Sequence, residues 1–239
     1  MGDRPLSPGA RRGTTLERYG SCIYASVGVA ARDFARVTRR FAHVWEGVTW
    51  PALAVNVVLR LLILAFTVDA LINAGDDRFA GKALGPRNVG ILLGLSMLFP
   101  LLQAVRGQWK RYPMWFDNLY LSIFALDMAG NSLNLYNAVE WWDHVPHFHG
   151  PGALTVVMMG AFGMRAIAAM GLTTILHTAL ETQEYYGDVF LHTHNVKGIA
   201  DTVNDELFAL FGVLIYAFIF TRSMYLRRRR APRQHSRSS

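Results

Sequence analysis

The sequence predicts an all-α, multi-pass transmembrane helical bundle. Of its 239 residues, 52% are hydrophobic and only 17% are charged, which is more apolar than a soluble domain of this length usually is. Apolar segments long enough to cross a bilayer recur along the chain, beginning with residues 50–72. The net charge of +7 lies at the two ends and in short loops, so it forms no compact face for nucleic acid.

Residues 1–49 and 227–239 are predicted to lie on the cytoplasmic side. Within residues 22–45, apolar residues recur at helical spacing opposite four arginines, which predicts an amphipathic helix in the headgroup plane. The tail is rich in arginine and contains no acid, as expected of a topology anchor. Both basic ends should attract anionic lipid headgroups, while no particular protein partner is indicated.

The bundle itself is predicted to occupy residues 50–226. Its first span, residues 50–72, carries Arg60, which must face the interior because a charge facing lipid is costly. An ion pair with an acid on another helix is favoured there over a place in a transport path. The second span, residues 88–105, is apolar apart from Pro100, and a short basic loop follows it.

The third span, residues 113–136, is unusually polar. Asp127, Asn131 and Asn134 are spaced i, i+4, i+7, so they are expected to share one helix face. Such a face should contact other helices rather than lipid, because polar groups in hydrocarbon need protein partners.

Residues 145–186 fit either one long helix or a hairpin that turns near residues 160–165. Five spans would place the arginine tail outside, whereas six spans place both termini in the cytoplasm and satisfy the positive-inside rule. Six spans are therefore favoured, with five as the alternative. The final span is predicted at residues 205–225.

On the six-span topology, several helices present polar side chains at their non-cytoplasmic ends. Residues four apart on a helix point the same way, so separate pairs can reach one site. The predicted cluster comprises Asp143, His147, Glu181, Asp201 and Asp205, with Asp127, Asn131, His177 and Glu184 as further members. Mixed imidazole and carboxylate ligands suit a divalent transition metal such as zinc, iron or manganese, although no HExxH motif is present.

Three functions fit this pattern. The first is a metal-binding or proton-transferring membrane protein, with hydrolysis of a lipid or envelope substrate as one possible reaction. The second is a small-solute transporter or channel in which Arg60 and Asp127 line a polar path. The third is a non-catalytic subunit or scaffold whose helices are held in register by the polar cluster.

The C-terminal half resembles the YjdF-like family of bacterial inner-membrane proteins, whose function is unknown. The resemblance lies in Trp142-Asp143 with His147-Phe148, in Glu181, and in Asp201 and Asp205 followed by Gly212. It covers about 110 residues from Asp127 onward. It implies a six-span bundle and no particular reaction.

Overall fold

A computed structural model describes residues 48–80, 82–107, 112–193, 196 and 198–230, which form only helices and the turns that link them. The amphipathic helix expected at residues 22–45 lies outside this part of the chain. The principal helices are α2 (Trp50–Ile72), α3 (Leu84–Leu93), α4 (Leu98–Arg106), α5 (Met114–Ser132), α7 (His144–Gly160), α8 (Ala166–Leu191) and α9 (Ile199–Arg230). A single turn of helix, α6 (Leu135–Ala138), lies between α5 and α7.

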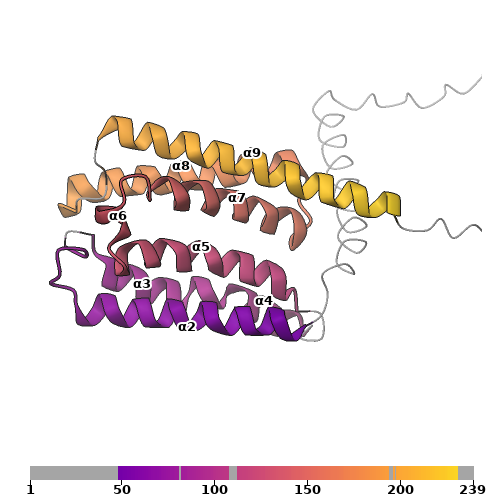
Figure 1. The fold of residues 1–239 in the computed structure, drawn as a ribbon, viewed down its shortest axis with the longest axis horizontal. Helices are drawn as coiled ribbons and strands as arrows, with labels where there is room; N and C mark the ends of the chain where they lie inside the picture. Colours follow the sequence, from indigo (N-terminus) through magenta and orange to yellow (C-terminus); the bar gives the residue numbers. More distant parts are fainter. Residues whose placement is uncertain (1–47, 81, 108–111, 194–195, 197, 231–239) are drawn as a thin grey trace, which may run out of the picture.

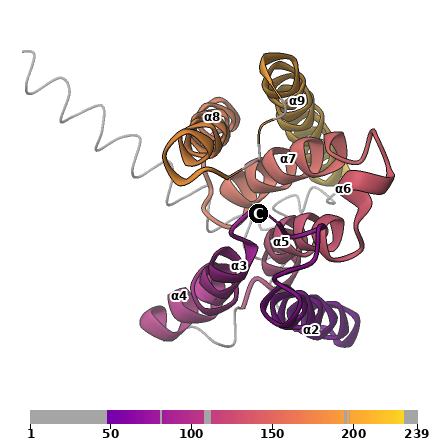
Figure 2. The ribbon, with the colours of Figure 1, turned by 90° about the vertical axis from the view of Figure 1, so that its left-hand side faces the viewer.

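The helices run side by side in two groups. Helices α2 to α5 form one group and α7 to α9 the other, as Figures 1 and 2 show from the side and from one end. Helix α5 packs against α2 and also against α7, so it joins the two groups. Aromatic side chains such as Phe99, Phe116 and Tyr120 fill much of the core beside α5.

The surface of the bundle indicates a membrane protein. Three helical segments are long and apolar enough to cross a bilayer: Trp50–Ile72, Leu84–Arg106 and Ile199–Arg227. Their outer faces, and that of α8, carry large exposed apolar side chains such as Leu61, Ile175 and Phe218. A soluble protein rarely exposes so much apolar surface, whereas lipid accepts it.

The second apolar segment differs from the single helix that was predicted. It begins at Leu84 and is interrupted by a short 3₁₀ turn, Leu95–Met97, between α3 and α4. Pro100 has no N–H, so it cannot donate to the carbonyl of Ser96 in a regular helix. Arg60 donates to that carbonyl instead, with Nη1 2.7 Å from the oxygen. The break is thus compensated by a side chain from α2.

The chain reverses direction between α7 and α8, as the hairpin prediction required. Helix α7 ends at Gly160, and the turn contains Gly163 in the left-handed region with φ of 67°. Glycine adopts this conformation without the steric cost that a Cβ imposes. Helix α8 then begins at Ala166 and packs back along α7. The alternative of one continuous helix over residues 145–186 is therefore wrong.

The predicted shared face of Asp127, Asn131 and Asn134 is only partly correct. Helix α5 ends at Ser132, and Asn134 has a left-handed backbone with φ of 57° outside the helix. Asparagine tolerates this conformation better than most residues, so Asn134 lies in a turn that follows α5 and does not continue the helix. The last helix also starts earlier than predicted, at Ile199, which places Asp201 and Asp205 on its first turns.

Helices α7 and α9 touch at their backbones. A Cβ added at Gly212 would lie 1.9 Å from the carbonyl oxygen of Phe148, and one at Gly152 would meet the ring of Tyr216 at 2.6 Å. Small residues are what allow membrane helices to approach so closely. This contact fixes the spacing of the two helices one to two turns from His147 and Asp205.

We predict that Gly212→Ala destabilises the bundle by about 1–3 kcal/mol, because the added methyl group forces α7 and α9 apart. Thermal unfolding in detergent measures the effect. Gly171→Ala on α8 is the matched control, because a Cβ there meets nothing within 4 Å. Equal stability of the two variants would contradict the close crossing.

Candidate metal centre

Histidine and carboxylate side chains gather at one end of the bundle. The link from α2 to α3, the short helix α6 and the link from α8 to α9 all lie at this end, on the left in Figure 1. Asp143 and His147 lie at the start of α7 and Asp205 on the second turn of α9, near this end, whereas His177 and Glu181 lie near the middle of α8.

His147 on α7 lies at the middle of the cluster. Its Nδ1 is 3.0 Å from Nε2 of His177 and 3.4 Å from Oε1 of Glu181, both on α8. Its Nε2 is 3.5 Å from Oδ1 of Asp143 and 3.7 Å from Oδ1 of Asp205 on α9. The two ring nitrogens of one imidazole therefore face different groups of ligand atoms.

Two pairs in the cluster follow directly from helical spacing. Asp143 and His147 are four residues apart, as are His177 and Glu181, where Nε2 and Oε1 are 3.7 Å apart. Asp205 reaches the same place because α9 crosses α7 at Gly212, two helical turns further on. One cluster thus depends both on local periodicity and on the crossing of α7 and α9.

The donor atoms form two groups suited to a cation. His147, His177 and Glu181 form the first, and Asp143, His147 and Asp205 the second; within each, the ligand atoms lie within 4.8 Å of one another. Ligands about 2.0–2.2 Å from a tetrahedral zinc ion would lie about 3.4 Å apart. Most separations in the cluster are close to that value and too long for good direct hydrogen bonds.

Burial strengthens the case for a bound cation. The side chain of Glu181 is 5% exposed, and its Oε1 makes no hydrogen bond with any described residue. A buried carboxylate oxygen in that state is unfavourable, and a metal ion in contact with Oε1 would relieve it. Without a cation, the short distance between His147 and His177 permits a hydrogen bond between the two rings.

Glu206 is a member of the cluster that the sequence did not reveal. Its Oε2 is 3.5 Å from Nδ1 of His177. Asp205 was predicted because it lies four residues after Asp201, on the same helix face. Glu206 is the next residue, so its side chain points about 100° further round the helix. Only the position of α8 beside that face shows that it belongs to the cluster.

The structure brings Asp143, His147, His177, Glu181 and Asp205 together, but it places the other predicted residues differently. Asp201 lies one turn before Asp205, and it belongs to neither donor group found among the described residues. Glu184 lies one turn beyond Glu181, within electrostatic reach of both His147 and Arg87. It therefore borders the cluster on the side of α3.

Asp127 and Asn131 belong to a neighbouring polar network. Arg87 donates to Asp127 with Nη2 and Oδ2 2.7 Å apart, and Tyr136 donates to the other carboxylate oxygen over 2.9 Å. Burial and the nearby carboxylate of Asp127 raise the pKa of Tyr136 well above its usual value, so the hydroxyl remains a donor. Lys82 donates to Oδ1 of Asn131 over 3.2 Å. These contacts join α3, the link before it and α6 to α5.

Arg60 forms the predicted ion pair with an acid on another helix. Its Nη2 is 2.8 Å from Oδ2 of Asp117, whose side chain is fully buried. Its Nε donates to Asn56, and Tyr112 and Asn56 both donate to the same carboxylate oxygen. This network holds α2, α5 and the 3₁₀ turn between α3 and α4 together, so the donors of Arg60 serve a structural role.

Ser122, His149 and Tyr216 form a chain of hydrogen bonds that resembles a nucleophile with its base. The Ser122 hydroxyl donates to the carbonyl of Leu119 over 2.7 Å and lies 2.9 Å from Nε2 of His149. A serine that already donates must accept from the ring, so Nδ1 of His149 then accepts from Tyr216 over 2.8 Å. The arrangement ties α5, α7 and α9 together and leaves no free base.

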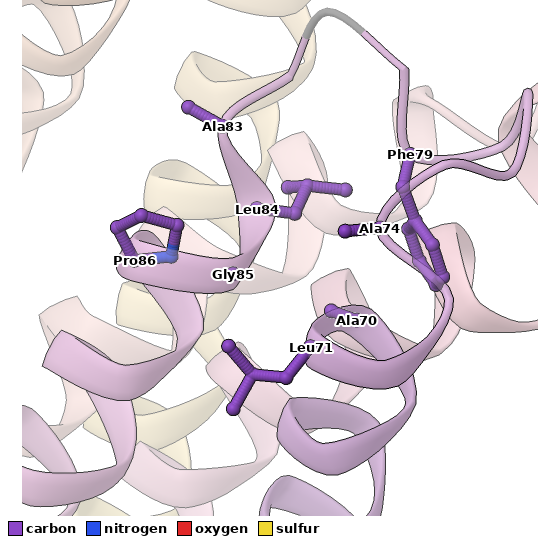
Figure 3. Close-up of a pocket in the computed structure, with 8 residues that line it drawn as sticks. All are labelled: Ala70, Leu71, Ala74, Phe79, Ala83, Leu84, Gly85 and Pro86. Atoms are coloured by element: carbon purple, nitrogen blue, oxygen red, sulfur yellow. The ribbon is translucent and has the colours of Figure 1, made fainter.

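The described residues form at least two cavities away from this cluster. Figure 3 shows the first, about 270 Å³, between the end of α2 and the start of α3, with Leu71, Leu84 and Pro86 on its walls. The second, about 370 Å³, is an apolar hollow between α2, α5, α7 and α9, lined by residues such as Val55, Trp115 and Phe220. Neither includes a member of the histidine and carboxylate cluster.

Comparison with known proteins gives no significant match to a protein family, a curated protein or a solved structure. Function is therefore inferred from the chain's own geometry.

We predict that Asp117→Ala destabilises the protein by about 3–5 kcal/mol, because it leaves the mostly buried Arg60 without its counter-ion. In the double variant Arg60→Met with Asp117→Ala, much of this loss should be recovered. Denaturant unfolding of both variants measures the coupling, and Asp77→Ala on the exposed link serves as control. Strictly additive losses would contradict a closed structural network.

Proposed function

We propose that the chain is a multi-pass inner-membrane protein that binds a divalent transition metal between α7, α8 and α9. The observation that carries the proposal is the meeting of His147, His177 and Glu181 from two helices, with a carboxylate oxygen that is buried and makes no hydrogen bond within the described chain. Two imidazoles and one carboxylate form a ligand set typical of zinc and of other first-row metals.

The proposed topology has six spans: α2, the segment from α3 to α4, α5, α7, α8 and α9. Arg106 ends α4, Arg165 directly precedes α8, and α9 ends in arginines. These three helix ends lie at one end of the bundle, to the right in Figure 1. The metal centre lies toward the opposite end. By the positive-inside rule, the arginine end faces the cytoplasm and the centre is on the outer side of the membrane.

Labelling with a membrane-impermeant maleimide tests this topology. In a Cys22→Ser background, we expect Asn137→Cys to react in intact spheroplasts and Ser236→Cys to react only after permeabilisation. Residue 137 is exposed at the end of α6, which makes its cysteine accessible. Reaction of the residue 236 cysteine from outside would contradict six spans and favour five.

The ligand count suggests what the centre does. Three protein ligands leave a tetrahedral ion one position for water, which the metal would make more acidic. Asp143 and Asp205 lie on the Nε2 side of His147, away from an ion on Nδ1, so neither is placed to accept a proton from that water. Because His147 and Asp205 lie near the proposed outer ends of α7 and α9, a lipid headgroup or another envelope molecule is the substrate class we propose for hydrolysis.

The other two functions have less support. A solute path would use Arg60 and Asp127, yet the first is bound to Asp117 and the second to Arg87. Both described cavities are lined mainly by apolar residues. A scaffold role predicts the same packing without a metal, so it is distinguished by metal content. The YjdF-like resemblance fits the proposal, because Asp143, His147, Glu181 and Asp205 carry it.

We predict that the protein, purified in detergent with a tag that does not bind metal, retains at least one transition-metal ion per chain. His147→Ala and Glu181→Gln should each weaken metal binding by about 100-fold or more. Each removes a side chain that binds the metal directly, and loss of a group that only supports such a ligand already costs about 10–100-fold. Elemental analysis after gel filtration measures the content.

Glu140→Gln is the matched control, because it makes the same chemical change on an exposed residue at the same end of the bundle. It should keep the wild-type metal content. If the purified wild-type protein contains no metal, and if it also fails to bind added zinc, manganese or iron, the scaffold role is the better account.

A further inference from the structure

The imidazole of His147 has ligand atoms on both sides. Nδ1 faces His177 and Glu181, while Nε2 faces Asp143 and Asp205. A single ion bound through Nδ1 would leave the second group of donors without a cation. Histidine binds metals through either ring nitrogen, and the ring that loses both protons can bind through the two together.

The charge of the cluster points the same way. Three carboxylates lie against His147 with little exposure: Asp143 at 18%, Glu181 at 5% and Asp205 at 7% of the side chain. One divalent ion with neutral histidines leaves a net negative charge in this buried place, which is costly. Two divalent ions with His147 as an imidazolate balance the charge of these three carboxylates and the ring, so the remaining negative charge is that of the more exposed Glu206.

We propose that the centre holds two divalent cations, one on each ring nitrogen of His147. This proposal rests on the proposed metal-binding function and extends it. The first ion takes Nδ1 of His147 with His177 and Glu181. The second takes Nε2 of His147 with Asp143 and Asp205, and its binding displaces the remaining ring proton, which leaves to solvent.

The two positions differ in their chemistry. The first has two nitrogens and one oxygen, which suits zinc or another imidazole-preferring ion. The second has one nitrogen and two carboxylate oxygens, which suits manganese or another oxygen-preferring ion. The site is therefore expected to fill with different affinities when one metal is added stepwise.

Cobalt titration of the full-length protein, stripped with chelator and kept in detergent, tests the proposal. We expect wild type to bind two equivalents of Co²⁺ by absorption and by elemental analysis. Asp143→Asn with Asp205→Asn should bind one, and His177→Gln with Glu181→Gln should also bind one. Glu140→Gln together with Asp77→Asn, both on exposed residues, should still bind two.

Proton release gives a second readout for the bridge. In weakly buffered solution, binding of the second equivalent of Co²⁺ should release one proton, which comes from the ring of His147 and not from a carboxylate. His147→Ala should abolish this release. If Asp143→Asn with Asp205→Asn fails to fold, Asp143→Asn alone replaces it, because Asp143 is the more exposed of the two acids.

Two results would overturn the inference in distinguishable ways. A wild-type protein that binds one equivalent, lost with His177→Gln and Glu181→Gln but unaffected by Asp143→Asn with Asp205→Asn, rejects the second ion and leaves the proposed function in place. A wild-type protein that binds none rejects both.

Discussion

The backbone contact between α7 and α9 sets the geometry on which the centre depends. Gly212 lets α9 approach the carbonyl of Phe148, and Gly152 provides the matching space on α7 for the ring of Tyr216. With the helices at this distance, Asp205 comes within 3.7 Å of His147. The turn at Gly163 supplies the other constraint, because it returns the chain so that His177 and Glu181 lie beside the same imidazole.

Two buried polar networks in this bundle are balanced differently. Around Asp117, one carboxylate accepts from Arg60, Asn56 and Tyr112, so its negative charge is matched by a guanidinium. Around His147, acids outnumber the histidines available to balance them. A charge removed from water needs a partner of opposite sign, and a bound cation is the partner that we propose for the carboxylates of the second network.

Helical spacing and charge asymmetry predicted much of this molecule. Asp143 with His147, and His177 with Glu181, follow from spacing of four, and the hairpin follows from the distribution of arginines. The sequence could not show that Asn134 leaves the helix, that Pro100 is accommodated by a 3₁₀ break, or that Glu206 faces His177. Those outcomes depend on which neighbouring helix supplies a partner, and periodicity within one helix carries no such information.

The central claim is that His147 binds a cation and does not only form hydrogen bonds with its neighbours. Anomalous diffraction from crystals of the metal-loaded protein tests it most directly. The account predicts an anomalous peak about 2.0–2.2 Å from Nδ1 of His147, shared with His177 and Glu181. Ordered side chains with no anomalous peak, and His147 bonded directly to His177 and a neighbouring acid, would contradict it.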